Sequence, residues 1–156
     1  MGMNLDWRES AFSALGTAEL YAIVAARVAV FVVEQDCPYQ DLDGLDAASL
    51  HLWGSTADGQ LAAYARITPP GTRFAEPSIG RVLTAQDFRG VGLGRALMLR
   101  AMDLAGRHYP RAPLRISAQQ YLDGFYTSLG FRFVRGPYPE DGIAHIEMLR
   151  SEHRER

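Results

Sequence analysis

Apolar side chains recur at helical spacing in the first quarter of the chain. Between residues 18 and 31 they fall three or four positions apart, which is the spacing of one buried helix face. The residues that set this pattern are Leu20, Ile23, Val24, Val28 and Phe31. We therefore predict a helix over residues 18–31, with the hydroxyl group of Thr17 capping its first turn.

The second half of the chain contains two further helical patterns. Apolar residues from Leu93 to Leu104 lie on one face of a helix that spans residues 93–109, and Pro110 ends that helix. A short helix is expected over residues 121–129, because Gly130 suits the position that follows a helix end.

Short apolar segments between turn residues predict β-strands. The Asp58-Gly59 pair predicts a hairpin of residues 50–56 and 60–67, because it supplies the positive φ angles of a tight turn. Residues 136–142 contain Gly136-Pro137 and are expected to connect the last two strands as a loop. The other strands are expected over residues 7–9, 78–84, 114–118, 131–135 and 144–149. This order predicts a mixed α/β sheet in one domain over residues 4–150, with a polar tail over residues 151–156.

Composition narrows the class of protein. Hydrophobic residues make up 47% and charged residues 22% of the 156 residues, as in an ordinary globular domain. Cys37 is the single cysteine, which excludes an internal disulfide and fits a cytoplasmic protein. The apolar segment over residues 20–33 is too short to span a membrane. The sequence leaves the oligomeric state open, a homodimer included.

Charges are unevenly distributed along the chain. The 16 basic residues are all arginine, and seven of them lie between Arg81 and Arg115. Five acidic residues and no basic residue lie between Glu34 and Asp46. Either segment alone is typical of a solvated surface, but together they suggest a site with anionic phosphates at one end and a cationic substrate at the other. Nucleic acid is not expected as a partner, because the net charge is −2 and no basic stripe interleaved with aromatic residues appears.

A glycine-rich segment lies between a predicted strand and a predicted helix. It reads Arg89-Gly90-Val91-Gly92-Leu93-Gly94-Arg95. Glycines allow main-chain N–H groups to approach a ligand, and the start of a helix presents unpaired N–H groups with partial positive charge. A dinucleotide fingerprint would need glycine at Arg95, and a Walker loop would need a lysine, which this chain lacks. The segment therefore predicts an anion site of another kind, or a sterically tight turn.

Two motifs in this order resemble the GCN5-related N-acetyltransferase (GNAT) superfamily. The first is Arg-x-x-Gly-x-Gly, met here by Arg89, Gly92 and Gly94, and the second is Phe-Tyr-x-x-x-Gly-Phe over residues 125–131. The stretches over residues 20–44 and 141–146 resemble the ElaA-like branch, with Ala144 where proline is expected. The resemblance implies a GNAT fold, in which a mostly antiparallel mixed sheet splays at the cofactor site between helices on both faces.

The resemblance also implies roles for individual residues, with acetyl-CoA as the donor. Tyr126 matches the general acid, Phe125 should pack beside the cofactor, and Gln119 stands where many members have a cofactor-contacting asparagine. Main-chain amides should hold the pyrophosphate, and a strand end should run beside the pantetheine arm. The residues expected at the pyrophosphate are Arg89, Gly90, Val91, Gly92, Leu93, Gly94 and Arg95. The residues expected beside pantetheine are Val82, Leu83 and Thr84.

The general base and the acceptor pocket are less well defined by the sequence. Glu34 follows an apolar run and is a candidate base, although an ion pair with Arg27 would explain it equally well. His51, His145 and Glu147 are alternative bases, and either histidine could instead be structural. Arg66 and Arg81, with the two histidines, are candidates for the acceptor pocket, where they could select a carboxylate. No metal site is expected, because the aspartates of residues 41–46 lack the downstream glutamate of a calcium loop.

These observations predict an enzyme that transfers an acetyl group from acetyl-CoA to an amine of a small molecule or peptide. The amine would attack directly in a ternary complex, because Cys37 has no neighbouring histidine in the sequence to activate it. The alternative is a non-catalytic module that binds or senses acyl-CoA.

Overall fold

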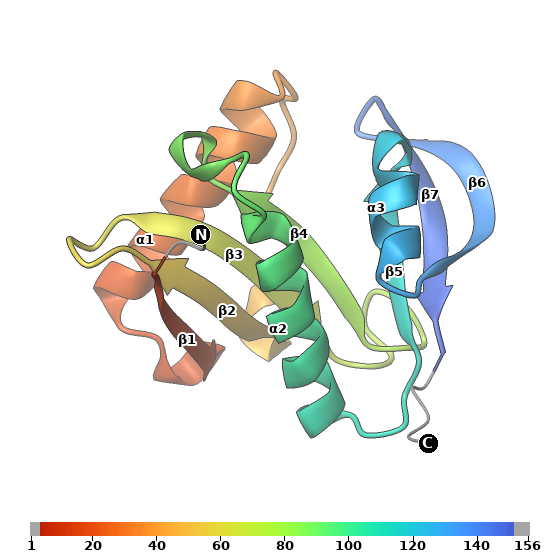
Figure 1. Cartoon of the computed structure of the whole chain (residues 1–156), viewed down its shortest axis with the longest axis horizontal. Coiled ribbons are helices and arrows are strands. Elements are labelled where there is room, and N and C mark those ends of the chain that lie inside the picture. The colour runs from red at the N-terminus through yellow and green to blue at the C-terminus, as the bar shows by residue number, and fades with distance from the viewer. Residues whose placement is uncertain (1–3, 152–156) are drawn as a thin grey trace.

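The computed structural model describes residues 4–151 as one seven-stranded sheet with helices on both faces (Figure 1). The strand order is β1-β2-β3-β4-β5-β7-β6, and neighbours are antiparallel except β4 and β5. The strands are β1 (Asp6–Ala11), β2 (Leu50–Ser55), β3 (Leu61–Thr68), β4 (Ser78–Thr84), β5 (Leu114–Gln119), β6 (Arg132–Glu140) and β7 (Ile143–Arg150). The predicted mixed α/β architecture is confirmed. The predicted polar tail lies outside the described residues, apart from Ser151.

The first helix differs from its prediction at both ends. Helix α1 (Thr17–Arg27) continues into the π-helical segment Val28–Glu34. Its N-cap is Gly16 rather than Thr17, and the Gly16 N–H donates to the Glu19 side chain at 2.8 Å. The capping prediction was wrong because Thr17 is already the first helical residue, and Gly16 takes the extended conformation of the cap position at φ −74° and ψ 159°.

Alternate residues of the central strands belong to two separate hydrophobic cores. Ala63 and Ala65 of β3 pack toward α2 (Leu93–His108), whereas Tyr64 packs toward α1 with Ile23 and Leu83. Successive strand residues point to opposite faces, so a strand buried on both sides needs apolar residues throughout. Helix α3 (Asp123–Ser128) lies on the α2 side, where Tyr126 joins the larger core. The helices therefore cover the middle of the sheet on both faces (Figure 1).

The last hairpin is longer than the sequence predicts. Residues 136–140 belong to β6, so their assignment to a loop was wrong, and the turn consists of Asp141 and Gly142. β6 is an edge strand that pairs with β7, and an edge position tolerates proline because a missing N–H removes no ladder bond there. The register shifts between Arg135 and Tyr138, around Gly136-Pro137.

The centre of the sheet opens between its two parallel strands. β4 and β5 pair at Ser78 and Arg115, near the start of each strand, and diverge beyond that point (Figure 1). A bulge in β4 places Arg81 and Val82 opposite one residue of β3, with Arg81 at φ +51°. Bulges bend a strand and interrupt its pairing, so this one helps to open the sheet.

Within residues 4–151, no helix is long and apolar enough to cross a membrane.

Candidate functional site

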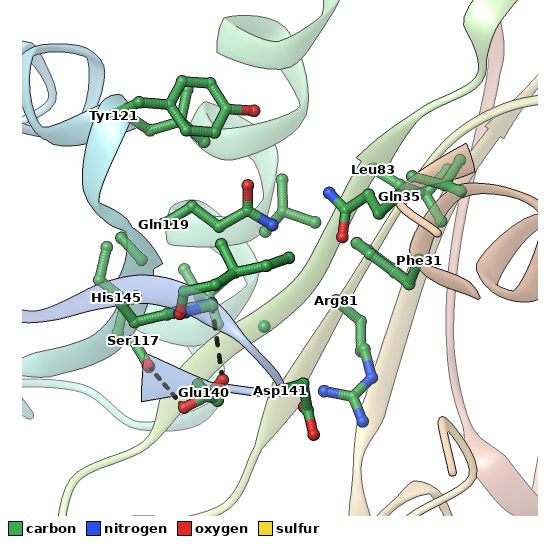
Figure 2. Close-up of a pocket in the computed structure, with 18 of the residues that line it drawn as sticks. Phe31, Gln35, Arg81, Leu83, Ser117, Gln119, Tyr121, Glu140, Asp141 and His145 are labelled. Carbon is green, nitrogen blue, oxygen red and sulfur yellow. Dashed lines mark hydrogen bonds and ion pairs between the residues drawn. The ribbon is translucent and has the colours of Figure 1, made fainter. Parts of the chain in front are cut away.

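A cavity of about 450 Å³ occupies the opening between β4 and β5 (Figure 2). Its walls come from the π-helical segment, the middle of β4, the end of β5, helix α3 and the β6–β7 turn. In Figure 2, Gln119 of β5 and Gln35 face each other across the cavity, with Tyr121 at one end and Glu140 at the other. The cavity therefore runs through the opening in the sheet. One end lies at Tyr121, after β5, and the other at Glu140, at the end of β6.

Five of the predicted cofactor contacts lie on two facing walls of the cavity. Val82, Leu83 and Thr84 line it from β4, and Gln119 and Phe125 line it from the opposite side. Residues that are far apart in sequence thus meet around a channel that an extended arm such as pantetheine could occupy. The geometry brings these candidates together, while their contacts with a ligand stay a prediction.

The glycine-rich segment forms the start of α2 at one end of the cavity. Gly92 is the N-cap of α2 at φ +77°, and Gly90 has φ +83°. A β carbon built on either glycine meets no atom within 4 Å, so the space outside the turn is open. Arg89 and Gly94 of this segment also line the cavity. Open N–H groups at a helix start, beside arginine, fit an anionic group such as a pyrophosphate.

Three side chains of this segment, those of Leu93, Arg95 and Val91, have different surroundings. Leu93 is buried in the core below α2, so it can offer a ligand only its main chain. The exposed Arg95 side chain donates to the Ser128 hydroxyl group at 3.1 Å, which ties α2 to α3. Val91 is exposed and is not among the residues that line the cavity.

Tyr126 lines the cavity from α3 and is 6% exposed. Its ring meets Phe125 and Phe131 edge-on, at centroid distances of 5.0 and 6.0 Å. Burial raises the pKa of its hydroxyl group to about 12. The phenol therefore keeps its proton at neutral pH and can donate it within the cavity.

Glu34 lies on the cavity wall, but its carboxylate is bound by arginine. Arg89 donates to both Glu34 oxygens, and the longer of these bonds is 3.0 Å. The Arg89 guanidinium thereby holds the pKa of Glu34 below its ordinary value. The alternative prediction, an ion pair between Glu34 and Arg27, was wrong, because Arg27 is buried and pairs with Asp41. A carboxylate bound by arginine is a weak proton acceptor, which argues against Glu34 as the base.

The acidic segment forms a buried ion network on the α1 side of the sheet. Arg27 lies 2.8 Å from Asp41 and 2.7 Å from Asp46, and both Arg27 and Asp41 are almost fully buried. Burial opposes the charge on Arg27, but its bonds with the two aspartates outweigh this effect and raise its pKa. Each charge therefore depends on its partners for compensation.

His51 and Arg66 belong to this network and do not line the cavity, so its geometry gives no support to their assignment to the acceptor pocket. Arg66 donates to Asp43 at 2.8 and 2.9 Å and to Asp46 at 3.0 Å. His51 lies 2.7 Å from the Tyr64 hydroxyl group and 3.0 Å from the Asp46 carbonyl oxygen. Both side chains are 1% exposed and make structural contacts, although the buried Nε of Arg66 has no hydrogen-bond partner.

Arg81 connects the network to the cavity. It lines the cavity from the β4 bulge, while its guanidinium lies 2.8 Å from an Asp41 carboxylate oxygen and 3.3 Å from Asp43. The network thus fixes the loop after the π-helical segment against β4, and Arg81 is less free to bind an acceptor carboxylate than the sequence suggests.

The Arg27→Met substitution tests how much this network stabilises the fold. We expect the free energy of unfolding to fall by about 3 kcal/mol or more, because the change takes one of two arginine partners from both Asp41 and Asp46 inside a buried network. Urea denaturation followed by circular dichroism measures this loss. Arg107→Met, which removes an exposed ion pair with Glu9, is the control and should leave the denaturation midpoint nearly unchanged. Equal midpoints for the two variants would contradict a stabilising network.

The cavity end opposite Tyr121 contains polar residues that the sequence did not single out. Ser117, Glu140 and Asp141 line it, together with the predicted His145 (Figure 2). Arg73 also lines the cavity and donates to Glu140. Glu140 was missed because Gly136-Pro137 suggested a loop there. The alternation of β5 was the available signal, because Leu114, Ile116 and Ala118 are buried and Ser117 must face the other side.

Among residues 4–151, no group of three or more histidine, cysteine or acidic side chains is arranged to hold a metal ion. What the site offers is a cavity in the opening of a splayed sheet, an open glycine turn at a helix start and a buried phenol. These are features of proteins that transfer acyl groups from coenzyme A. The sequence model described as "Acetyltransferase (GNAT) domain" matches residues 18–151, and the chain belongs to this family.

Particular relatives place the chain in the ElaA-like branch of the family. Protein ElaA of Escherichia coli is 41% identical over 148 residues, covering 94% of this chain and 96% of ElaA. A UPF0039 protein of Synechocystis is 46% identical over 147 residues, covering 94% and 96% of the two chains. A crystal structure of an acyl-CoA N-acyltransferase from Pseudomonas aeruginosa superposes with a TM-score of 0.90 at 43% identity, covering 95% of this chain and all of that chain.

Proposed function

We propose that this protein transfers an acetyl group from acetyl-CoA to an amine of a small molecule or peptide. The observation that carries the proposal is the course of the cavity. It joins the open glycine turn at the start of α2 to a polar end lined by Glu140 and His145. Donor and acceptor can therefore enter from different ends and meet beside Tyr126, which favours direct transfer in a ternary complex.

The donor site requires little from side chains. Main-chain N–H groups of residues 89–95 and the partial positive charge of α2 would hold the pyrophosphate. Val82, Leu83 and Thr84 would run beside the pantetheine arm, with Gln119 and Phe125 on the other side. When bound, acetyl-CoA supplies a thioester carbonyl that an amine can attack.

Tyr126 is the proposed acid. Its hydroxyl group keeps a proton at neutral pH, because the pKa of a phenol is about 10 and burial raises it further, to about 12. It can give that proton to sulfur as the carbon–sulfur bond breaks. Cys37 also lines the cavity, but its thiol donates to the Asp141 carbonyl oxygen at 3.1 Å. Direct attack by the amine needs no acyl-enzyme on this thiol. A cytoplasmic location would keep the thiol reduced.

The test is release of coenzyme A from acetyl-CoA in the presence of single amines. The panel contains polyamines, amino acid amides, aminoglycosides and peptides with a free N-terminus. We expect turnover with at least one of them, with an N-acetylated product of the expected mass. If coenzyme A raises the melting temperature but no amine is acetylated, a non-catalytic acyl-CoA-binding module would replace the proposal. If coenzyme A does not stabilise the protein at all, both proposals would fail.

A further inference from the structure

The polar end of the cavity contains an imidazole whose free nitrogen is defined by the structure. His145 lies on β7 directly opposite Gln119 of β5. Opposite residues of an antiparallel pair share one face of the sheet, so both side chains reach the same part of the cavity. His145 is 8% exposed and lines the cavity, as Figure 2 shows.

The main chain determines which nitrogen of His145 holds the proton. Nδ1 lies 2.7 Å from the Ile143 carbonyl oxygen, which can only accept a hydrogen bond. A neutral His145 therefore has its proton on Nδ1 and a lone pair on Nε2. Nε2 lies 3.7 Å from a Glu140 carboxylate oxygen, close enough for an ion pair once the ring is protonated.

Glu140 is itself held in place. Its Oε1 atom accepts hydrogen bonds from Arg73 at 2.9 Å and from the Ser117 hydroxyl group at 3.0 Å. Oε2 is the atom nearer the imidazole, and the Tyr138 ring stacks with His145 at a centroid distance of 6.4 Å. The charged and titratable groups around the ring are thus Glu140 and Tyr138 from β6 and Arg73 from the loop between β3 and β4. Glu147 on β7 is also near, and it pairs with Arg115 and Arg135.

The other proton acceptors on the cavity wall are already engaged or lie at its rim. Glu34 is bound by Arg89, and the Tyr39 hydroxyl group donates to Asp41 at 2.7 Å. The Cys37 thiol donates to a carbonyl oxygen, and Asp141 is an exposed turn residue. His145 is therefore the lining residue whose lone pair is both oriented by a fixed hydrogen bond and backed by a carboxylate.

We propose that His145 is the general base of the reaction and that Glu140 is its positioning residue. This inference rests on the proposed acetyl transfer. A proton leaves the acceptor ammonium for Nε2, and the freed lone pair of the amine forms the new bond to the acetyl carbon. As the carbon–sulfur bond breaks, sulfur receives the Tyr126 proton, and the second amine proton restores it. Glu140 stabilises the imidazolium until its proton passes to solvent.

The first test requires no turnover. Spectra of protein with ¹⁵N-labelled histidine rings report which nitrogen is protonated, and the His145→Gln variant assigns the His145 signals among the four histidines of the chain. We expect the neutral ring to have its proton on Nδ1, both alone and with coenzyme A bound. A proton on Nε2 would overturn the proposal, whatever the enzyme does with amines.

The second test is the pH dependence of acetylation with the amine that the panel identifies. His145→Gln should lower kcat by about 100-fold or more and abolish the acidic limb of the profile, because a general base contributes about 10²–10⁴-fold. Glu140→Gln should keep that limb and lower kcat less than His145→Gln does, with the KM for acetyl-CoA little changed, because Nε2 remains but the imidazolium loses its counter-charge. Stabilisation by coenzyme A should persist in both variants.

His108→Gln is the matched control, because His108 is exposed at the end of α2 and outside the cavity. It should retain the wild-type profile. A His145→Gln variant that keeps the wild-type rate and acidic limb would remove His145 from the chemistry while leaving the proposed function intact. Absence of turnover by the wild-type protein would instead refute the proposed function, and the ring spectra would still decide the protonation of His145.

Discussion

The Gly92→Glu variant is expected to lose coenzyme A binding. Gly92 occupies the left-handed region at φ +77°, and an added side chain would extend into the open space where we place the pyrophosphate. The glutamate would add bulk, strain and negative charge at the same point. Losing two charge-assisted hydrogen bonds of about 1.5–3 kcal/mol each raises Kd by about 100-fold or more. Isothermal titration with coenzyme A measures this change.

Two control variants separate the causes of that loss. Gly106→Glu places the same charge on the same helix at an exposed position with no atom within 4 Å of the new β carbon, and it should bind normally. Gly92→Asn tolerates the left-handed backbone without adding charge, so its affinity should lie between those of the other two. Normal affinity in Gly92→Glu would contradict the assignment of this turn to the phosphates.

The Tyr126→Phe variant is expected to lower kcat by about 100-fold, while the KM for acetyl-CoA changes little. The substitution removes one oxygen and keeps the ring packed against Phe125 and Phe131, so the cavity wall should be preserved. Steady-state kinetics at saturating amine measure both constants.

Tyr21→Phe makes the same chemical change at a side chain that is 79% exposed, and it should leave kcat unchanged. An unchanged kcat in Tyr126→Phe would limit Tyr126 to packing against the donor. A large rise in KM with kcat preserved would indicate a binding contact, because such a contact acts equally on the ground and transition states.

Local patterns were enough to predict the elements that form the donor end. Strand β4 spans Ser78–Thr84 and α2 begins at Leu93, as the sequence predicts. Glycines at the N-cap and alternating apolar residues leave few other local structures. The motifs around Gly92 and Tyr126 indicated the family. In the fold, Val82 and Gln119 lie on opposite walls of one cavity.

The acceptor end depends on pairings between distant residues, which a single sequence does not reveal. Glu34 pairs with Arg89, which lies 55 positions away, rather than with the nearby Arg27. Arg27 is instead compensated by Asp41 and Asp46. Arg66 pairs with Asp43 and Asp46 and does not line the cavity. Residues near Gly136-Pro137 read as a loop, because edge-strand positions are recognised only once the strand order is known.

The most direct test of the account is a crystal structure of this protein with coenzyme A bound. We predict the pyrophosphate on the main-chain N–H groups of residues 89–95, the pantetheine arm between Val82–Thr84 and Gln119, and the sulfur within hydrogen-bonding distance of the Tyr126 hydroxyl group. Coenzyme A bound outside the opening between β4 and β5, or a sulfur directed away from Tyr126, would contradict it.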